Sequence, residues 1–127
     1  MSSGENSAEY AAVLVQLGDA HMVQGALSNP RAQLAYERAL EIFAAEGEES
    51  AETAWLDDKL ANVKQSSGDS AGAEADLAKA VEFWRGHPQA GTVAPAVSER
   101  YLARREEDLE RLIRLNEFQN RKPPPLE

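Results

Sequence analysis

The sequence predicts an all-α fold: a stack of antiparallel helix hairpins, made of two repeats and closed by a long C-terminal helix. One pattern of residues occurs twice, about 40 positions apart and with helical spacing inside each copy, which is typical of stacked helical repeats. Alanine, the best helix former, contributes 22 of the 127 residues. No stretch alternates Val, Ile or Thr as a half-buried strand does.

The two copies share their internal distances as well as their residue types. Leu and the later Gly are eight residues apart in both, and Ala and the following bulky residue are four apart in both. Only the step from Gly to Ala differs, seven residues against five, which places two extra residues of the first repeat near Ala26-Leu27-Ser28. The first copy is Leu17-Gly18, Gly25, Ala32, Tyr36, Ala39-Leu40 and Ile42, and the second is Leu60-Ala61, Gly68, Ala73, Leu77, Ala80-Val81 and Phe83.

The first repeat is expected to span residues 8–47. Ser7 provides an N-cap for its first helix, and Gly25 ends that helix because Gly adopts a left-handed conformation cheaply. Asn29 is expected to cap the second helix, with Pro30 in the first turn. The expected buried row of the first helix is Tyr10, Val13, Leu14, Leu17 and Gly18, and that of the second is Ala32, Tyr36, Ala39, Leu40, Ile42 and Phe43.

The second repeat is expected to span residues 50–86. Ser50 caps its first helix, and Gly68-Asp69-Ser70 forms a turn and a new cap. Gly86-His87-Pro88 ends the second helix because Pro cannot continue a helix interior. Phe83 and Trp84 are expected to pack under the loop before Pro95. The apolar row of its first helix is Ala54, Leu56, Leu60 and Val63, and that of its second helix is Ala73, Leu77, Ala80, Val81 and Trp84.

A fifth helix is predicted over residues 95–118, opened by Pro95. Leu102 follows Leu60 by 42 residues, so this helix starts as a third copy of the first repeat helix, but Glu110 stands where the turn Gly would be. Such a helix would cap the open end of the stack. Residues 1–7 and the Pro-rich residues 119–127 are expected to be disordered.

These motifs resemble the tetratricopeptide repeat family, most closely in LGDAHMVQG…AQLAYERALEIF and more loosely in KLANVKQSSGDSAGAEADLAKAVEF. The spacing near 42 is similar to that of kinesin-light-chain repeats. The likeness covers residues 10–86, and residues 93–103 weakly. His21 and Lys64 replace a usual Tyr, and Asp57 replaces a bulky residue. The resemblance implies a right-handed stack.

The resemblance also implies a function, because the first helices of such repeats line a concave groove that holds a peptide or helix of another protein. A chaperone-type clamp on a terminal carboxylate is not expected, since Val15 and Asp19 occupy the places of its Lys and Asn. Asp19 and Asp58 would favour a basic or polar segment, and Trp55 an apolar contact. The expected groove residues are Val15, Asp19, Met22, Trp55, Asp58, Asn62, Gln65, Arg100 and Arg104, with Ala12, Val23, Ser66 and Glu107 beside them.

Composition limits the other function classes. The formal net charge is −9, and it comes entirely from residues 1–92, which argues against nucleic acid as a partner. There is no Cys, no apolar run of membrane length, no apolar signal core and only two His, so we expect a cytoplasmic protein without a metal site or cofactor. No nucleophile elbow or phosphate loop is present, and we expect no enzyme.

Two alternatives to a protein-binding adaptor stay open. The apolar side of the fifth helix, with Leu109, Leu112, Ile113 and Leu115, would allow self-assembly into a homodimer. The second alternative is that the chain is a regulatory segment of a larger signalling protein.

Overall fold

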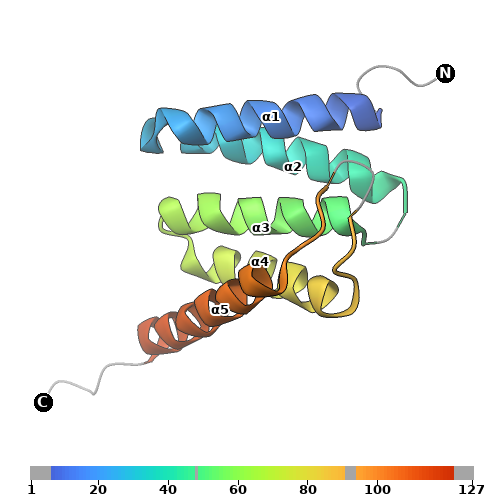
Figure 1. Ribbon diagram of the computed structural model, residues 1–127. Coiled ribbons are helices and arrows are strands. Elements are labelled where there is room, and N and C mark those ends of the chain that lie inside the picture. The colour runs from blue at the N-terminus through green and yellow to red at the C-terminus, as the bar shows by residue number, and fades with distance from the viewer. Residues whose placement is uncertain (1–6, 48, 91–93, 122–127) are drawn as a thin grey trace, which may run out of the picture.

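The computed structural model describes residues 7–47, 49–90 and 94–121, and these residues form five α-helices and one short 3-10 turn. Consecutive helices run in alternating directions, and each packs on the next (Figure 1). The predicted all-α class, with neighbouring helices paired, is therefore confirmed. The elements are α1 (Ala8–Gln24), η1 (Ala26–Ser28), α2 (Asn29–Ala45), α3 (Ala51–Ser66), α4 (Ser70–Gly86) and α5 (Glu99–Asn120).

Serine side chains start the first helix of each repeat, as predicted. Ser7 Oγ accepts the backbone N–H of Tyr10 at 3.1 Å. Ser50 and Thr53 form a capping box. The N–H of Ser50 donates to Thr53 Oγ1 at 2.8 Å, and the N–H of Thr53 donates to Ser50 Oγ at 3.3 Å. The expected cap at Asn29 is wrong by one residue. Ser28 holds the cap position, and the buried Asn29 side chain donates to Ser66 Oγ at 3.2 Å instead.

The first repeat depends on a close approach of α1 and α2. A Cβ atom added to Gly18 would lie 2.5 Å from the ring of Tyr36, so only glycine fits at this position. In the second repeat Ala61 stands in place of the glycine and Leu77, smaller than tyrosine, stands in place of Tyr36. Ala61 and Leu77 belong to one core cluster. The duplicated small-and-bulky pattern of the sequence is thus a pair of matched helix contacts.

The core runs through the stack in three clusters, each shared between successive helices. Trp84, with Phe83 beside it, packs against Val97, which follows Pro95, and not against the loop before Pro95 as predicted. The first cluster joins α1, α2 and α3 through Leu14, Tyr36, Ile42, Phe43, Leu56 and Leu60. The second joins α3, α4 and α5 through Ala61, Leu77, Val81 and Leu112.

The predicted buried row of α1 is wrong for three of its five residues. Leu14 and Gly18 are buried, and Ala11 joins them, but Tyr10, Val13 and Leu17 are exposed. Leu17 is 46% exposed, whereas its counterpart Leu60 is 2% exposed. The difference has a simple cause. Leu60 packs against the α1–α2 hairpin, and in the described part of the chain no hairpin lies against the outer side of α1.

The fifth helix begins later than predicted. Residues 94–98 are not helical, the N–H of Val97 donates to the carbonyl of Pro88 at 3.0 Å, and Ser98 caps α5 by accepting from Tyr101 N–H at 3.0 Å. Pro95 therefore precedes the helix instead of opening it.

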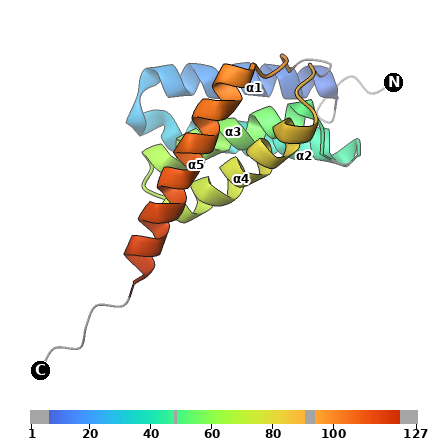
Figure 2. The same ribbon diagram turned by 60° about the horizontal axis from the view of Figure 1, so that its bottom comes forward.

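α5 also ends later than predicted, because residues 119–120 are helical. The expected disorder of residues 1–6 and 122–127 lies outside the described residues. α5 crosses α4 obliquely, and its C-terminal end extends past the stack (Figure 2). Leu112 is buried and Leu109 packs beside it, so much of the α5 apolar side is used within the chain.

Candidate partner-binding groove

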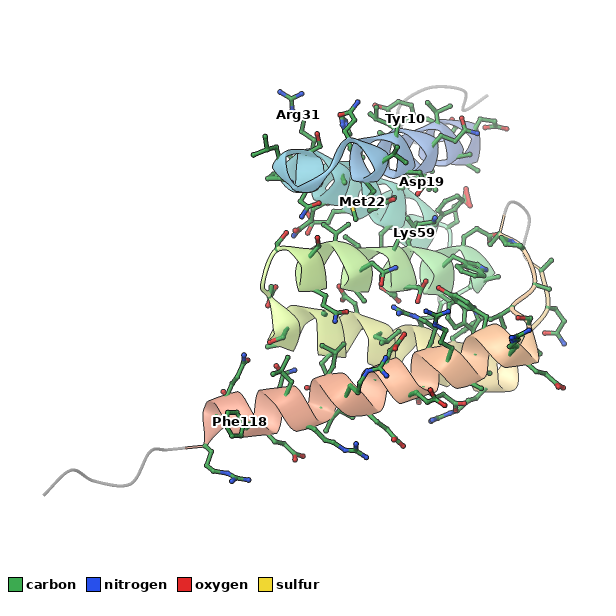
Figure 3. The ribbon with its side chains drawn as sticks, turned by 60° about the vertical axis from the view of Figure 1, so that its left-hand side comes forward. Tyr10, Asp19, Met22, Arg31, Lys59 and Phe118 are labelled. Carbon is green, nitrogen blue, oxygen red and sulfur yellow. The ribbon has the colours of Figure 1, made fainter. Side chains whose placement is uncertain are left out.

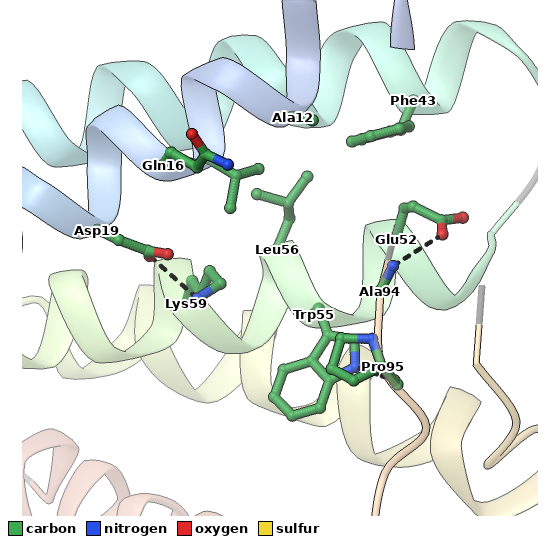
Figure 4. Close-up of a pocket in the computed structure, with 11 residues that line it drawn as sticks. Ala12, Gln16, Asp19, Phe43, Glu52, Trp55, Leu56, Lys59, Ala94 and Pro95 are labelled. Carbon is green, nitrogen blue, oxygen red and sulfur yellow. Dashed lines mark hydrogen bonds and ion pairs between the residues drawn. The ribbon is translucent and has the colours of Figure 1, made fainter. Parts of the chain in front are cut away.

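A pocket of about 480 Å³ lies between α1, α3 and the segment that precedes α5 (Figure 4). α1 contributes one wall because Ala12, Val15, Gln16 and Asp19 recur at three- and four-residue steps on one helix face. α3 contributes the facing wall. The remaining lining residues are Phe43, Glu52, Trp55, Leu56, Lys59, Ala94 and Pro95.

The polar end of the pocket is an ion pair between the two walls. Lys59 Nζ lies 3.0 Å from Asp19 Oδ1, and the hydroxyl of Tyr36 donates to the same oxygen at 2.5 Å. Figure 3 shows Asp19 and Lys59 meeting between α1 and α3. Burial, reinforced by the Asp19 contact, raises the pKa of Tyr36 well above its ordinary range. Asp19 is thus occupied by partners from its own chain, so it offers a ligand little uncompensated negative charge.

The aromatic end of the pocket is built around Trp55. Its indole Nε1 donates to the carbonyl of Pro95 at 2.7 Å, and its ring stacks on Tyr101 at 5.3 Å and meets Trp84 edge-on at 4.8 Å. These contacts fix the half-buried ring in place, with part of it left in the pocket.

The segment before α5 forms a third wall, which sequence reasoning missed. The N–H of Ala94 donates to a carboxylate oxygen of Glu52 at 3.3 Å, and Pro95 lies beside Trp55 (Figure 4). This segment contains no sequence motif that predicts that it lines a pocket. Only its tether to α3 brings it to the pocket.

Asp58 does not belong to the groove, contrary to the sequence-based expectation. It is 2% exposed and accepts from Arg105 Nε at 2.6 Å and from the Tyr101 hydroxyl at 2.7 Å. The guanidinium of Arg105 also donates to Asn62 at 3.1 Å and to Asp108 at 2.9 Å. A charge on α3 is thus neutralised by α5, and the carboxylate that was expected to attract a partner holds two helices together instead.

The other expected groove residues do not converge on the pocket. Met22 is partly buried against the core, and Gln65 lines a separate hollow with Asp108, Arg111, Leu112 and Leu115. Asn62 is exposed but bonded to Arg105. Arg100 and Arg104 are exposed on α5 and form no ion pair with the described residues. Of the main predicted groove residues, the pocket therefore unites Val15, Asp19 and Trp55, and Ala12, expected beside them, lines it as well.

Residue size at one pair of equivalent positions explains why this pocket lies between α1 and α3. Ala12 precedes Trp55 by the same 43 residues that separate Leu17 from Leu60. The small side chain of Ala12 leaves space against α3, whereas Trp55, stacked with Tyr101, fills the corresponding space against α5. The exchange of Ala12 for Trp55 at equivalent positions of the two repeats is the sequence signal that could have located the pocket.

A second polar cluster lies between α3 and α4, away from the pocket. Asp57 is buried beside Asp76, and Lys64 Nζ lies 2.7 Å from Asp76 Oδ2. Burial and then the charge of Asp76 raise the pKa of Asp57 to about 7. The hydrogen bond to Asp76 raises the pKa of Lys64. None of these three residues lines the pocket, and the Lys64–Asp76 ion pair joins α3 to α4.

Among the described residues, no group of three or more His, Cys, Asp or Glu side chains is placed to hold a metal ion. The helices described here include none with the length and apolar character needed to cross a membrane. Comparison with known proteins finds no matching family, no related curated protein and no similar solved structure.

Proposed function

We propose that the chain is a tetratricopeptide-like adaptor that holds a segment of another protein in the pocket between α1 and α3. The proposal rests on one observation: Val15, Asp19 and Trp55, which the family resemblance assigns to a concave binding face, line one pocket. The Gly18–Tyr36 contact supports the family resemblance, since it joins the two helices at its signature positions.

The chemistry of the pocket indicates an apolar side chain as the main determinant of binding. Val15, Leu56, Phe43 and part of the Trp55 ring provide the apolar surface, and aromatic rings are enriched where partners bind. The polar end is already satisfied by the Asp19–Lys59 pair. We therefore propose a ligand segment with one bulky apolar residue inserted between α1 and α3, whose affinity depends only weakly on salt.

A peptide library displayed on phage and selected on the immobilised full chain tests this proposal. Selected peptides would be titrated against the parent chain, against Val15→Trp, which fills the pocket, and against Val23→Trp. Val23 is the matched control because it is on the same helix, is strongly exposed and does not line the pocket.

We expect Val15→Trp to weaken binding at least about tenfold, equivalent to about 1.4 kcal/mol, and Val23→Trp to change it less than about twofold. Circular dichroism would verify that both variants are folded. Peptides that bind both variants as well as the parent chain would exclude the pocket as the binding site.

A further inference from the structure

The pocket has a counterpart in the second half of the stack, and the chain itself fills that counterpart. Ala12 precedes Trp55 by 43 residues and Lys59 precedes Tyr101 by 42, so the two pairs occupy equivalent places in successive helices. Between α3 and α5 the Trp55 ring stacks on Tyr101, with the ring centroids 5.3 Å apart. Between α1 and α3 the equivalent residues, Ala12 and Lys59, both line the pocket. An aromatic ring thus fills in one copy the space that stays open in the other.

The size of residue 12 accounts for this difference. Ala12 is half-buried, and in Figure 4 it lies across the pocket from Leu56 and Trp55. Its neighbour Ala11 is fully buried in the core, so a larger residue there would be overpacked. A larger residue at position 12 would enter the pocket instead. Ala12 is therefore placed to set the size of the side chain that the pocket accepts.

The walls of the pocket favour an aromatic ring over an aliphatic side chain. Trp55 belongs to an aromatic cluster, since it stacks on Tyr101 and meets Trp84 edge-on at 4.8 Å, and it also lines the pocket. Phe43 lines the same pocket from α2. Aromatic rings attract one another in stacked and edge-on arrangements by more than their buried area alone provides. A ring inserted between α1 and α3 would continue the cluster that already joins α3, α4 and α5.

The polar end of the pocket also suits an aromatic ring. Lys59 Nζ lies 5.9 Å from the centroid of the Tyr36 ring, in addition to its ion pair with Asp19. A cation is attracted to the face of an aromatic ring, and an aliphatic side chain offers no such face. Because Asp19 and Lys59 neutralise each other, this end of the pocket does not require a charged ligand. Aromatic character and size therefore distinguish ligands here better than charge.

We propose that the partner inserts an aromatic side chain between α1 and α3, and that Ala12 determines this specificity by leaving room for the ring. The inference rests on the binding function proposed above and makes it specific. The partner supplies from outside the ring that Trp55 supplies within the second repeat. Ala12→Leu would occupy part of that space and leave room only for a smaller side chain.

Nuclear magnetic resonance titration of the isotope-labelled full chain tests the preference with four probes: the N-acetyl amides of tryptophan, phenylalanine, leucine and valine. Each is added up to about 10 mM, a range that detects millimolar binding. We expect the aromatic amides to shift the signals of the lining residues Val15, Leu56 and Lys59, and to bind roughly two- to tenfold more tightly than the leucine amide. Equal or tighter binding of the leucine amide, or no shift of these signals with any probe, would overturn the proposal.

Ala12→Leu tests the role of residue size. Ala20→Leu is the matched control, because Ala20 is exposed on the same helix and does not line the pocket. We expect Ala12→Leu to weaken binding of the tryptophan amide at least about fivefold and of the valine amide less than about twofold. Ala20→Leu should change neither affinity. An equal loss for both amides in Ala12→Leu would contradict the role assigned to Ala12.

Urea unfolding of the variants provides a second measurement that does not depend on binding. Ala12→Leu should unfold at the urea concentration of the parent chain or above it, because the added atoms extend into the pocket, whereas Ala11→Leu should unfold at a lower concentration. A lower midpoint for Ala12→Leu would refute the open space assigned to this position. Phage-selected peptides that bind elsewhere would refute the adaptor function, whereas the amides measure the preference of the pocket separately.

Discussion

Gly18 is the residue whose size most directly sets the geometry of the first hairpin. The Tyr36 ring occupies the place where its side chain would be, and the Tyr36 hydroxyl reaches Asp19 beside the pocket. The absence of a side chain at Gly18 thus allows α1 and α2 to approach closely. It also lets the Tyr36 hydroxyl reach Asp19, a lining residue of the candidate groove.

We predict that Gly18→Ala destabilises the chain by about 1–3 kcal/mol, because overpacking against the ring outweighs the gain of about 1 kcal/mol in helix propensity. Urea unfolding followed by circular dichroism measures the change. Gly86→Ala is the control, since no described residue lies within 4 Å of the added Cβ, and it should be neutral or slightly stabilising. Equal behaviour of the two variants would contradict the close approach of α1 and α2.

Asp57 makes the stability of the chain depend on pH. Its pKa rises from 3.8 in the unfolded reference to about 7 in the folded chain, so the folded chain binds the additional proton between these values. Its contribution to stability is therefore fully present below about pH 4 and is lost as the pH rises through about 7. Asp76 and Glu49 raise the pKa of Asp57, whereas Lys79 and Lys64 lower it.

We predict that Asp57→Asn raises the free energy of unfolding by roughly 1–3 kcal/mol at pH 8 and changes it little at about pH 4 or below. Thermal unfolding across this pH range measures the difference. Glu82→Gln, an exposed substitution on α4 that also removes one charge, should give a difference that does not depend on pH in this way. A constant effect of Asp57→Asn across the range would show that Asp57 stays ionised when folded.

At the scale of elements, the contact between α3 and α5 combines a buried ion pair with apolar packing. Arg105 of α5 is 7% exposed and neutralises Asp58 of α3, while Tyr101 donates to the same carboxylate. Burial is the main cause that raises the pKa of Tyr101 above its ordinary range, and the hydrogen bond to Asp58 adds to it. The pairing fixes how α5 lies on the stack, and it thereby fixes the wall of the pocket that precedes α5.

We predict that Arg105→Met destabilises the chain by about 3–5 kcal/mol, because it leaves the Asp58 carboxylate buried without its cation. Adding Asp58→Leu should recover most of that loss, since replacing both partners removes the unpaired charge. Arg104→Met, one residue away and exposed, should stay within about 0.5 kcal/mol of the parent chain. A double variant no more stable than Arg105→Met alone would indicate that the loss reflects packing and not charge.

At the scale of the whole molecule, α5 covers the last hairpin of the stack. Leu112, with Leu102 and Leu109 beside it, covers Leu77 and Val81 of α4. Removing these contacts exposes several large side chains, each worth about 1.5–3 kcal/mol when buried, and the sum is comparable to the total stability of a small domain.

We predict that a chain ending at residue 90 loses cooperative thermal unfolding and binds a dye specific for exposed apolar surface. Removing only residues 122–127 should shift the melting temperature by less than about 2 °C, because α5 ends at Asn120. A chain of residues 1–90 that melts cooperatively near the parent temperature would show that α5 is dispensable for the stack.

The sequence by itself determined the helices and their pairing. Helical periodicity is a local property, and so are the caps at Ser7 and Ser50 and the stops at Gly25 and at Gly86-His87-Pro88. Each depends on residues within one or two turns. The match of Gly18 with Tyr36 was visible as a repeated pattern, although its meaning as a close contact was not.

The tertiary structure alone decided which equivalent residues are buried and which face solvent. Leu17 and Leu60 occupy the same register, but among the described residues a hairpin packs against Leu60 and none packs against Leu17. Asp58 has the same residue type as Asp19 and was assigned to the same groove, but Arg105, 47 residues later, buries it. Burial depends on which element lies across a face, and no property of the residue or its neighbours in sequence specifies that element.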